Sequence, residues 1–385
     1  MTLVSEIDYR DIRKKYGMFT YPMAVVEVGG KLFSDNRHKL VLSEVQVELS
    51  CGMEASAAVF SIYNVYDLDK RAYQFRQFKD YVQLGSPITV SAGYSGVVEE
   101  LFVGFIAQTR FVCGDGDIHH VEVTAMDAKG LMMSGSYARQ MTADNYGDAV
   151  SEIFNKPLYQ KMSAEGICKS FQVDGTPDKN STENDKATSY SVEMVSESDY
   201  EFIMKAAKRF HYEFYVDTGV VYFRKAKQAP EECLMEIGMD KGVISYDITY
   251  DITGLVKSVE VRGMDTARAK MVSAVKKVSN RISTGNKAKA LIGQTQRIVI
   301  DAAAVSREQA QWRAESLMED ISYRFGTLEC DCVGIPEIRP GHFIRITGLE
   351  CPGDNRFYIT HVRHAVSDEN GYGTHITAIA ASLQK

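Results

Sequence analysis

Apolar and polar residues alternate along much of residues 21–127, which is typical of strands that bury one face. Val45, Val47 and Leu49 alternate with Glu and Gln in this way. A Gly-Gly pair at 29–30 predicts a hairpin turn. The pattern predicts strands over residues 24–28, 45–49, 57–63, 88–94, 101–111 and 119–125. Closely spaced strands with glycine turns favour a β-barrel or sandwich.

Residues 128–240 have a mixed pattern. The spacing of apolar residues predicts a helix over 145–159, and the polar stretch 174–189 predicts a solvated loop. Ser198 and Glu201 have the spacing of a capping box, which predicts a helix start. One buried face of that helix is expected from Ile203, Ala206, Ala207 and Phe210. Two strands at 212–216 and 220–223, joined by a turn at 217–219, should follow.

From residue 241 onward strands return, interrupted by a helix at 306–324. Ser306 and Gln309 have capping-box spacing, and Trp312 lies off the apolar stripe of this helix, so it is expected to pack against a neighbouring domain or subunit. The stripe consists of Ala310, Ala314, Leu317 and Ile321. Strands are predicted over 256–262, 297–300, 327–333, 343–347, 357–363 and 375–380.

The two β regions have similar patterns. Segments 84–90, 101–110 and 119–127 find counterparts, at nearly equal spacing, in 339–346, 356–364 and 374–382, with Phe102 aligned with Tyr358. This predicts a duplicated barrel. Two such barrels per chain, assembled three times about an axis, would present six equivalent surfaces and could abut a sixfold object.

Length and charge limit the function classes. The chain has 385 residues, 43.0 kDa and a formal net charge of -7, which indicates two or three domains and disfavours nucleic-acid recognition. The N-terminus lacks the apolar core of a signal peptide, and no run is long enough for a membrane span, so synthesis and folding are expected in the cytoplasm. Seven scattered cysteines indicate buried thiols rather than a disulfide framework.

No motif indicates catalysis or a cofactor. The chain has no H-E-x-x-H, G-x-S-x-G or phosphate-binding P-loop pattern. Cys330 and Cys332 share one face of a predicted strand, and with His342 and Cys351 they give four soft ligands, but C-x-C within a strand is a poor zinc pattern. We therefore expect these cysteines in a core and predict no catalytic, metal or cofactor-binding residue.

One segment reverses the acidic balance of the chain. Residues 265–290 contain seven bases and one acid, Asp265. The segment is either a solvated, partly helical loop or a docking surface for an acidic partner. The bases are Arg268, Lys270, Lys276, Lys277, Arg281, Lys287 and Lys289.

The order of these features resembles the phage late control D and VgrG family of baseplate hub proteins. The likeness is carried by the helix ESDYEFI with its hairpin, by LFVGFIAQTRFV, and by the block from REQAQWRAESLMEDI to YITHVRH. It covers residues 22–379, and its signature residues are expected to be structural. These are Glu197, Ser198, Asp199, Phe202, Tyr212 and Phe214.

The resemblance implies a mainly β chain with an α+β middle region. It implies an N-terminal extension (1–20), a first tube-like β-barrel (21–127), a connecting α/β domain (128–240) and a second barrel (241–385) with an inserted basic segment and helix. A homotrimer with pseudo-sixfold symmetry would join a hexameric tail tube to a trimeric central spike in a contractile phage tail, tailocin or related injection particle. Implied partners are the tube protein, a separate spike and a baseplate wedge or tape-measure protein.

The chain departs from the family pattern at two places, and two rival functions also fit the sequence. His211-Tyr212 replaces the glycine-containing pair often found after the signature helix, and the chain ends at Lys385, without the spike segment of VgrG chains. The rivals are the hub-like part of a non-contractile tail-associated protein and, from a different class, a tail-borne cell-wall hydrolase. A glycan- or protein-binding module is a third possibility.

Overall fold

The computed structural model describes residues 6–33, 39–113, 118–180, 192–228, 232–265, 268–278, 286–350 and 352–383. The helices are α1 Tyr9–Lys15, η1 Gly17–Phe19, α2 Phe75–Phe78, η3 Lys79–Tyr81, α3 Lys129–Met132, α4 Tyr146–Phe154, α5 Pro157–Ala164, η4 Pro177–Asn180, α6 Asp199–Phe210, α7 Asn286–Ile292 and α8 Arg307–Ser322. No helix in these ranges is both long and apolar enough to cross a membrane.

The strands make the chain mainly β. They are β1 Pro22–Val28, β2 Lys31–Leu32, β3 Val41–Ser50, β4 Ala57–Tyr63, β5 Tyr66–Asp67, β6 Ala72–Tyr73, β7 Pro87–Tyr94, β8 Val97–Val112, β9 His120–Met126, β10 Tyr137–Gln140, β11 Ser170–Val173, β12 Glu193–Glu197, β13 Tyr212–Asp217, β14 Val220–Lys225, β15 Glu236–Ile237, β16 Val243–Tyr250, β17 Ser258–Asp265, β18 Lys270–Lys277, β19 Gln296–Ile300, β20 Gly326–Val333, β21 Phe343–Ile346, β22 Asn355–Ser367 and β23 Gly371–Ala380.

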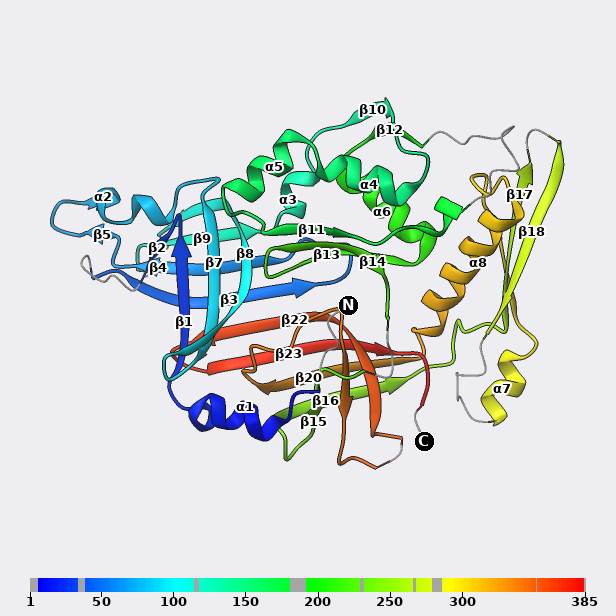
Figure 1. The fold of residues 1–385 in the computed structure, drawn as a ribbon. Helices are drawn as coiled ribbons and strands as arrows, with labels where there is room; N and C mark the ends of the chain where they lie inside the picture. The colour runs from blue at the N-terminus through cyan, green and yellow to red at the C-terminus, as the bar shows by residue number, and fades with distance from the viewer. Residues whose placement is uncertain are drawn as a thin grey trace.

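The two β regions share one sheet. Thirteen strands of the described residues pair in a single sheet, in which β22 of the second region lies antiparallel beside β3 of the first (Figure 1). One hydrophobic core also runs through both regions, and α1 covers it with Ile12 and Tyr16. The sequence predicts two similar tube-like barrels. In the described residues the strand pairing instead joins the two regions and closes neither into a barrel.

The pairing confirms the duplication. Neighbouring strands run β3-β4-β9-β8-β7-β1 in the first region and β16-β20-β23-β22-β21-β15 in the second. Corresponding pairs are antiparallel, except that β15 lies parallel to β21 whereas β1 is antiparallel to β7. The halves are therefore two similar six-stranded arrangements that differ in the direction of the last strand.

The register differs from the one predicted. The amide of Gly85 donates to the carbonyl of Ile106 (2.8 Å), and the amide of Gly341 donates to that of Ile359 (2.9 Å). Both glycines have a positive φ, and each long strand has a bulge directly after its isoleucine. Ile106 therefore corresponds to Ile359, and the predicted match of Phe102 with Tyr358 was wrong by three residues, because the β7–β8 hairpin is longer than β21–β22.

The middle region packs helices against a small sheet. Strands β11, β14 and β13 form this sheet, and α3, α4, α5 and α6 surround it with a core of their own. The single helix predicted over 145–159 was wrong: α4 ends at Phe154 and α5 begins at Pro157. Proline lacks the amide needed inside a helix but suits its first turn. Of the predicted loop at 174–189, residues 181–189 lie outside the described ranges.

A third unit projects from the second half. Strands β18, β17 and β19 form a separate sheet, and α8 packs on one face of it (Figure 1). The sequence assigned β17, β19 and α8 to the second barrel. The structure places them beside it, with Val259, Val261 and Ala274 facing the helix.

Candidate functional site

The signature segment lies at the centre of the middle region. Ser198 accepts a hydrogen bond from the amide of Glu201, and the Glu201 carboxylate accepts one from the Ser198 amide (2.7 Å), so the predicted capping box is confirmed. The predicted apolar face of α6 is buried, as are Phe202 and Phe214. Glu197 pairs with Lys205, and the Tyr212 hydroxyl donates to the carbonyl of Gly175 (2.7 Å).

Asp199 ties α6 to α5. Its carboxylate is buried and accepts hydrogen bonds from Lys156 (2.7 Å) and from the Tyr159 hydroxyl (2.6 Å). Burial is the main cause that raises the pKa of Tyr159, and the hydrogen bond to Asp199 raises it further. Every signature residue thus has a partner or a packed position inside the fold, and their arrangement supports a structural role.

His211 ends α6 at the position where the family that the sequence resembles often has a glycine-containing pair. It takes the left-handed conformation (φ 59°, ψ 52°) that usually selects glycine. Its Nδ1 lies 3.2 Å from a carboxylate oxygen of Asp320 on α8. Trp312 of α8 packs on Phe210 beside it, with ring centroids 5.7 Å apart, so Trp312 contacts a neighbouring region as predicted.

A buried polar cluster joins the β13–β14 hairpin to the second half. The hydroxyl of Tyr358 on β22 donates to Glu213 on β13, and Arg224 Nε lies 3.6 Å from the same carboxylate. Burial raises the pKa of Glu213 and, together with the nearby Glu213 charge, that of Tyr358. This cluster was not found from the sequence, because its members are far apart in the chain.

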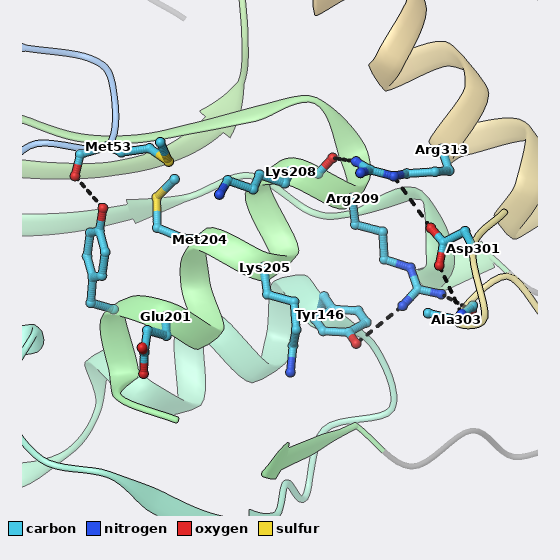
Figure 2. Close-up of a pocket in the computed structure, with 11 residues that line it drawn as sticks. Met53, Tyr146, Glu201, Met204, Lys205, Lys208, Arg209, Asp301, Ala303 and Arg313 are labelled. Atoms are coloured by element: carbon cyan, nitrogen blue, oxygen red, sulfur yellow. Dashed lines mark hydrogen bonds and ion pairs between the residues drawn. The ribbon is translucent and has the colours of Figure 1, made fainter. Parts of the chain in front are cut away.

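A hollow of about 620 Å³ lies between α6 and the segment that leads into α8 (Figure 2). Arg209 donates to the Ala303 carbonyl (3.0 Å), and Arg313 donates to the Lys208 carbonyl (2.8 Å) and pairs with Asp301 (3.5 Å). These contacts bridge the middle region and the third unit. The hollow lies at the junction of these two parts, and both arginines that line it already have hydrogen-bond partners.

Among the described residues, the members of the predicted basic cluster are spread along β18 and onto α7. Arg268 precedes β18, Lys270 begins the strand and Lys277 ends it, about 23 Å from Lys270 for eight residues of strand. Lys276 pairs with Glu315 of α8 (3.0 Å), whereas Lys287 and Lys289 are exposed on α7. Arg281 lies outside the described residues. In the described part of the segment, residues 270–277 form a strand and not the loop of the first alternative, and residues 286–290 belong to a helix.

The third unit has an apolar outer face that the sequence did not reveal. We use "outer face" for the side of the β18-β17-β19 sheet opposite α8. The register places Met264 opposite Met271, and Ile298 and Val275 on either side of Glu260. All the apolar side chains of this face are exposed: Met264, Met271, Val275, Ile298 and Ile300. Exposed apolar groups that cluster in this way are typical of protein contact surfaces.

The described cysteines fit a structural role. Cys330 and Cys332 point into the shared core with their sulfurs 3.5 Å apart, as predicted, and among the other described cysteines only Cys113 is exposed. Cys351 lies outside the described residues. Within those ranges no three His, Cys, Asp or Glu side chains are grouped to hold a metal ion.

A model of a known protein family matches most of the chain. The model of the Alg8 N-terminal domain family matches residues 62–368. The chain belongs to this family. The match differs from the late control D and VgrG family that the sequence resembles. No protein with a curated description matches the chain.

Solved structures share the fold over almost the whole chain. A tail protein from Neisseria meningitidis aligns with a TM-score of 0.64 and 12% identity over 94% of this chain and 97% of its own. A 43 kDa tail protein of prophage MuSo2 from Shewanella oneidensis aligns with a TM-score of 0.65 and 14% identity, over 94% and 98%.

The Escherichia coli c3393 protein aligns with a TM-score of 0.54 and 10% identity, over 93% of this chain and 77% of its own. It is described as a component of the type VI secretion system that is structurally similar to the T4 tail proteins gp27 and gp5. The fold of this chain is thus one also found in phage tail proteins.

Proposed function

We propose that the chain is a structural hub of a contractile phage tail, tailocin or related injection particle. In this role three copies would join a hexameric tail tube to a trimeric central spike, with no catalytic activity of their own. The protein would act in the assembled particle, in contact with the tube protein, the spike and a baseplate wedge or tape-measure protein.

The observation that carries this proposal is the duplicated half. Each chain contains two similar six-stranded arrangements. Three chains would supply six similar units, which is the number needed to meet a sixfold tube through a threefold assembly. The fold shared with two tail proteins over 94% of the chain supports the same setting.

The proposed organisation keeps the predicted ranges as parts of the hub: 1–20, 21–127, 128–240 and 241–385. The paired strands of 21–127 and 241–385, together with β15, would line the ring, and the middle region would brace it. The basic residues of 265–290 and the outer face of the third unit would meet neighbouring particle proteins.

Native mass spectrometry of the full chain, alone and with a candidate spike protein, tests the hub. We expect three copies of the chain in the complex. A strict monomer in both samples would overturn the proposal. Incubation with purified peptidoglycan should release no fragments, and release that one Asp or Glu substitution abolishes would favour the hydrolase instead.

A further inference from the structure

The pairing of β22 with β3 joins the two halves, and we call it the internal junction. The two strands that correspond to β22 and β3 have unpaired edges in the described residues. In the junction, the second part of β22 pairs with β3, from His361 opposite Ser50 to Val366 opposite Val45. The strand that corresponds to β22 is β8, and the strand that corresponds to β3 is β16. In the described residues, neither β8 beyond Phe105, on the side away from β9, nor the outer edge of β16 pairs with any strand.

The correspondence can be given residue by residue. Across the first half, Val47, Ala58, Ala125 and Ile106 lie opposite one another in successive strands. Across the second half, Ile248, Leu328, Ala378 and Ile359 do the same. Val47 therefore corresponds to Ile248. Phe111 lies five residues after Ile106, and His364 lies five residues after Ile359, so Phe111 corresponds to His364.

We infer that β8 of one chain pairs with β16 of a second copy, in the register of the internal β22–β3 junction. His364 lies opposite Val47 in that junction, so Phe111 would lie opposite Ile248 of the second copy. Arg110 would lie opposite Thr249, and Val112 opposite Asp247. In each chain β8 would pair with β16 of one neighbour, and β16 would pair with β8 of the other neighbour. Such a head-to-tail contact can close into a ring.

Burial supports the pairing. At the internal junction His364 and Val47 are each 1% exposed and Val45 is 5% exposed. At the open counterparts Phe111 is 48% exposed, and Tyr246, which precedes Ile248 by two residues as Val45 precedes Val47, is 44% exposed. A second copy would cover these apolar side chains. It would also satisfy backbone groups on two edges that otherwise invite pairing with another chain.

Charge supports the same register. Arg363 lies opposite Glu48 inside the junction. Its counterpart Arg110 is exposed, and in the inferred register it would have Asp247 and Asp251 of the second copy as diagonal neighbours. Opposite charges in such cross-strand positions are favourable.

This inference deepens the proposed hub and rests on its assembly from several copies. The test uses the full chain with Cys113→Ser and Cys351→Ser, to which Arg110→Cys and Thr249→Cys are added. After mild oxidation, denaturing gels without reductant should show covalent dimers and trimers, because each cysteine would face its partner in the next chain. Native mass spectrometry of the same sample reports the copy number independently.

Two matched variants make the result decisive. Glu48→Cys with Arg363→Cys places the pair at the internal junction and should give a disulfide within one chain. Arg110→Cys with Ile248→Cys moves one cysteine to the opposite face of β16 and should leave the chains uncrosslinked. If the internal pair does not oxidise, Val112→Cys with Asp247→Cys takes the place of the test pair, with Gln46→Cys and Ala365→Cys as its internal control.

The outcomes separate the inference from the hub. Trimers in native spectra, an oxidised internal pair and no covalent oligomer from the test pair would overturn the strand pairing and leave the hub intact. Covalent oligomers from the shifted pair as readily as from the test pair would also overturn it. Monomers in every native spectrum would overturn the hub itself.

Discussion

At the scale of single residues, buried polar side chains hold distant segments together. His364 on β22 shows this best: its Nδ1 accepts from the hydroxyl of Tyr372 (2.9 Å), and its Nε2 donates to the carbonyl of Ile338 (3.1 Å). Burial, with a smaller effect of the Arg339 charge, lowers the pKa of His364 to about 3. The ring is therefore neutral in the folded chain at neutral pH.

This buried histidine predicts sensitivity to acid. Below its ordinary pKa of 6.5, His364 takes up a proton in the unfolded chain but not in the folded one, so the free energy of unfolding falls as the pH drops from 6.5 towards 3. Between pH 7 and pH 5 the loss should be about 2 kcal/mol. Urea unfolding of the parent chain and of His364→Gln at both pH values measures it. The variant should lack this part of the pH dependence, and equal losses in both chains would contradict the prediction.

At the scale of elements, local signals and distant contacts act together. The capping box starts α6, and the left-handed His211 ends it. The helix then packs its apolar face on the middle core and receives α8 at its end through Phe210 and Trp312. Because α6 links the middle region to the third unit, the stability of its ends bears on both.

Ser198→Ala tests the start of this helix. The substitution removes the side-chain acceptor for the Glu201 amide, so the free energy of unfolding should fall by about 1 kcal/mol. Ser198→Gly is the matched control and should cost only a few tenths of that, because the backbone amide can then reach water. Thermal unfolding followed by circular dichroism measures both. A larger loss for glycine than for alanine would argue against capping as the cause.

At the scale of the whole molecule, the chain has surfaces suited to assembly. The edges of β8 and β16 are open in the described residues, and the outer face of the third unit presents apolar side chains. Exposed lysines surround this unit at both ends of β18 and on α7. The chain is acidic overall, so a local basic surface would favour an acidic neighbour.

Replacement of Lys270, Lys277 and Lys287 by alanine tests whether these exposed lysines contribute to the proposed docking surface. Co-assembly with the tube or spike protein should weaken, and the difference from the parent chain should shrink as salt rises, because salt screens exposed charges. Lys14, Lys70 and Lys161 replaced together remove the same charge elsewhere and should leave assembly unchanged. Co-sedimentation at low and high salt measures the effect. Equal weakening by both triple variants would show that only net charge matters.

The local elements could be predicted from the sequence alone. Alternating apolar residues predicted the strands of both halves, and capping residues predicted the starts of α6 and α8, because these signals act over a few neighbouring residues. The Gly-Gly turn at 29–30 and the buried face of α6 follow from the same local physics. Pro157 also carried the signal for the break between α4 and α5, which the apolar spacing concealed.

The way in which these elements combine depends on tertiary contacts. The pairing of β22 with β3 unites the two halves, and no local pattern specifies which strand meets which edge. The register of the duplication required its hydrogen bonds, because the halves differ in hairpin length and share few residues. The separation of β17, β18 and β19 into their own sheet, and the cluster around Glu213, likewise depend on contacts between segments far apart in the chain. Alternation specifies which side chains are buried in a strand, whereas the partner is chosen by the fit of whole surfaces.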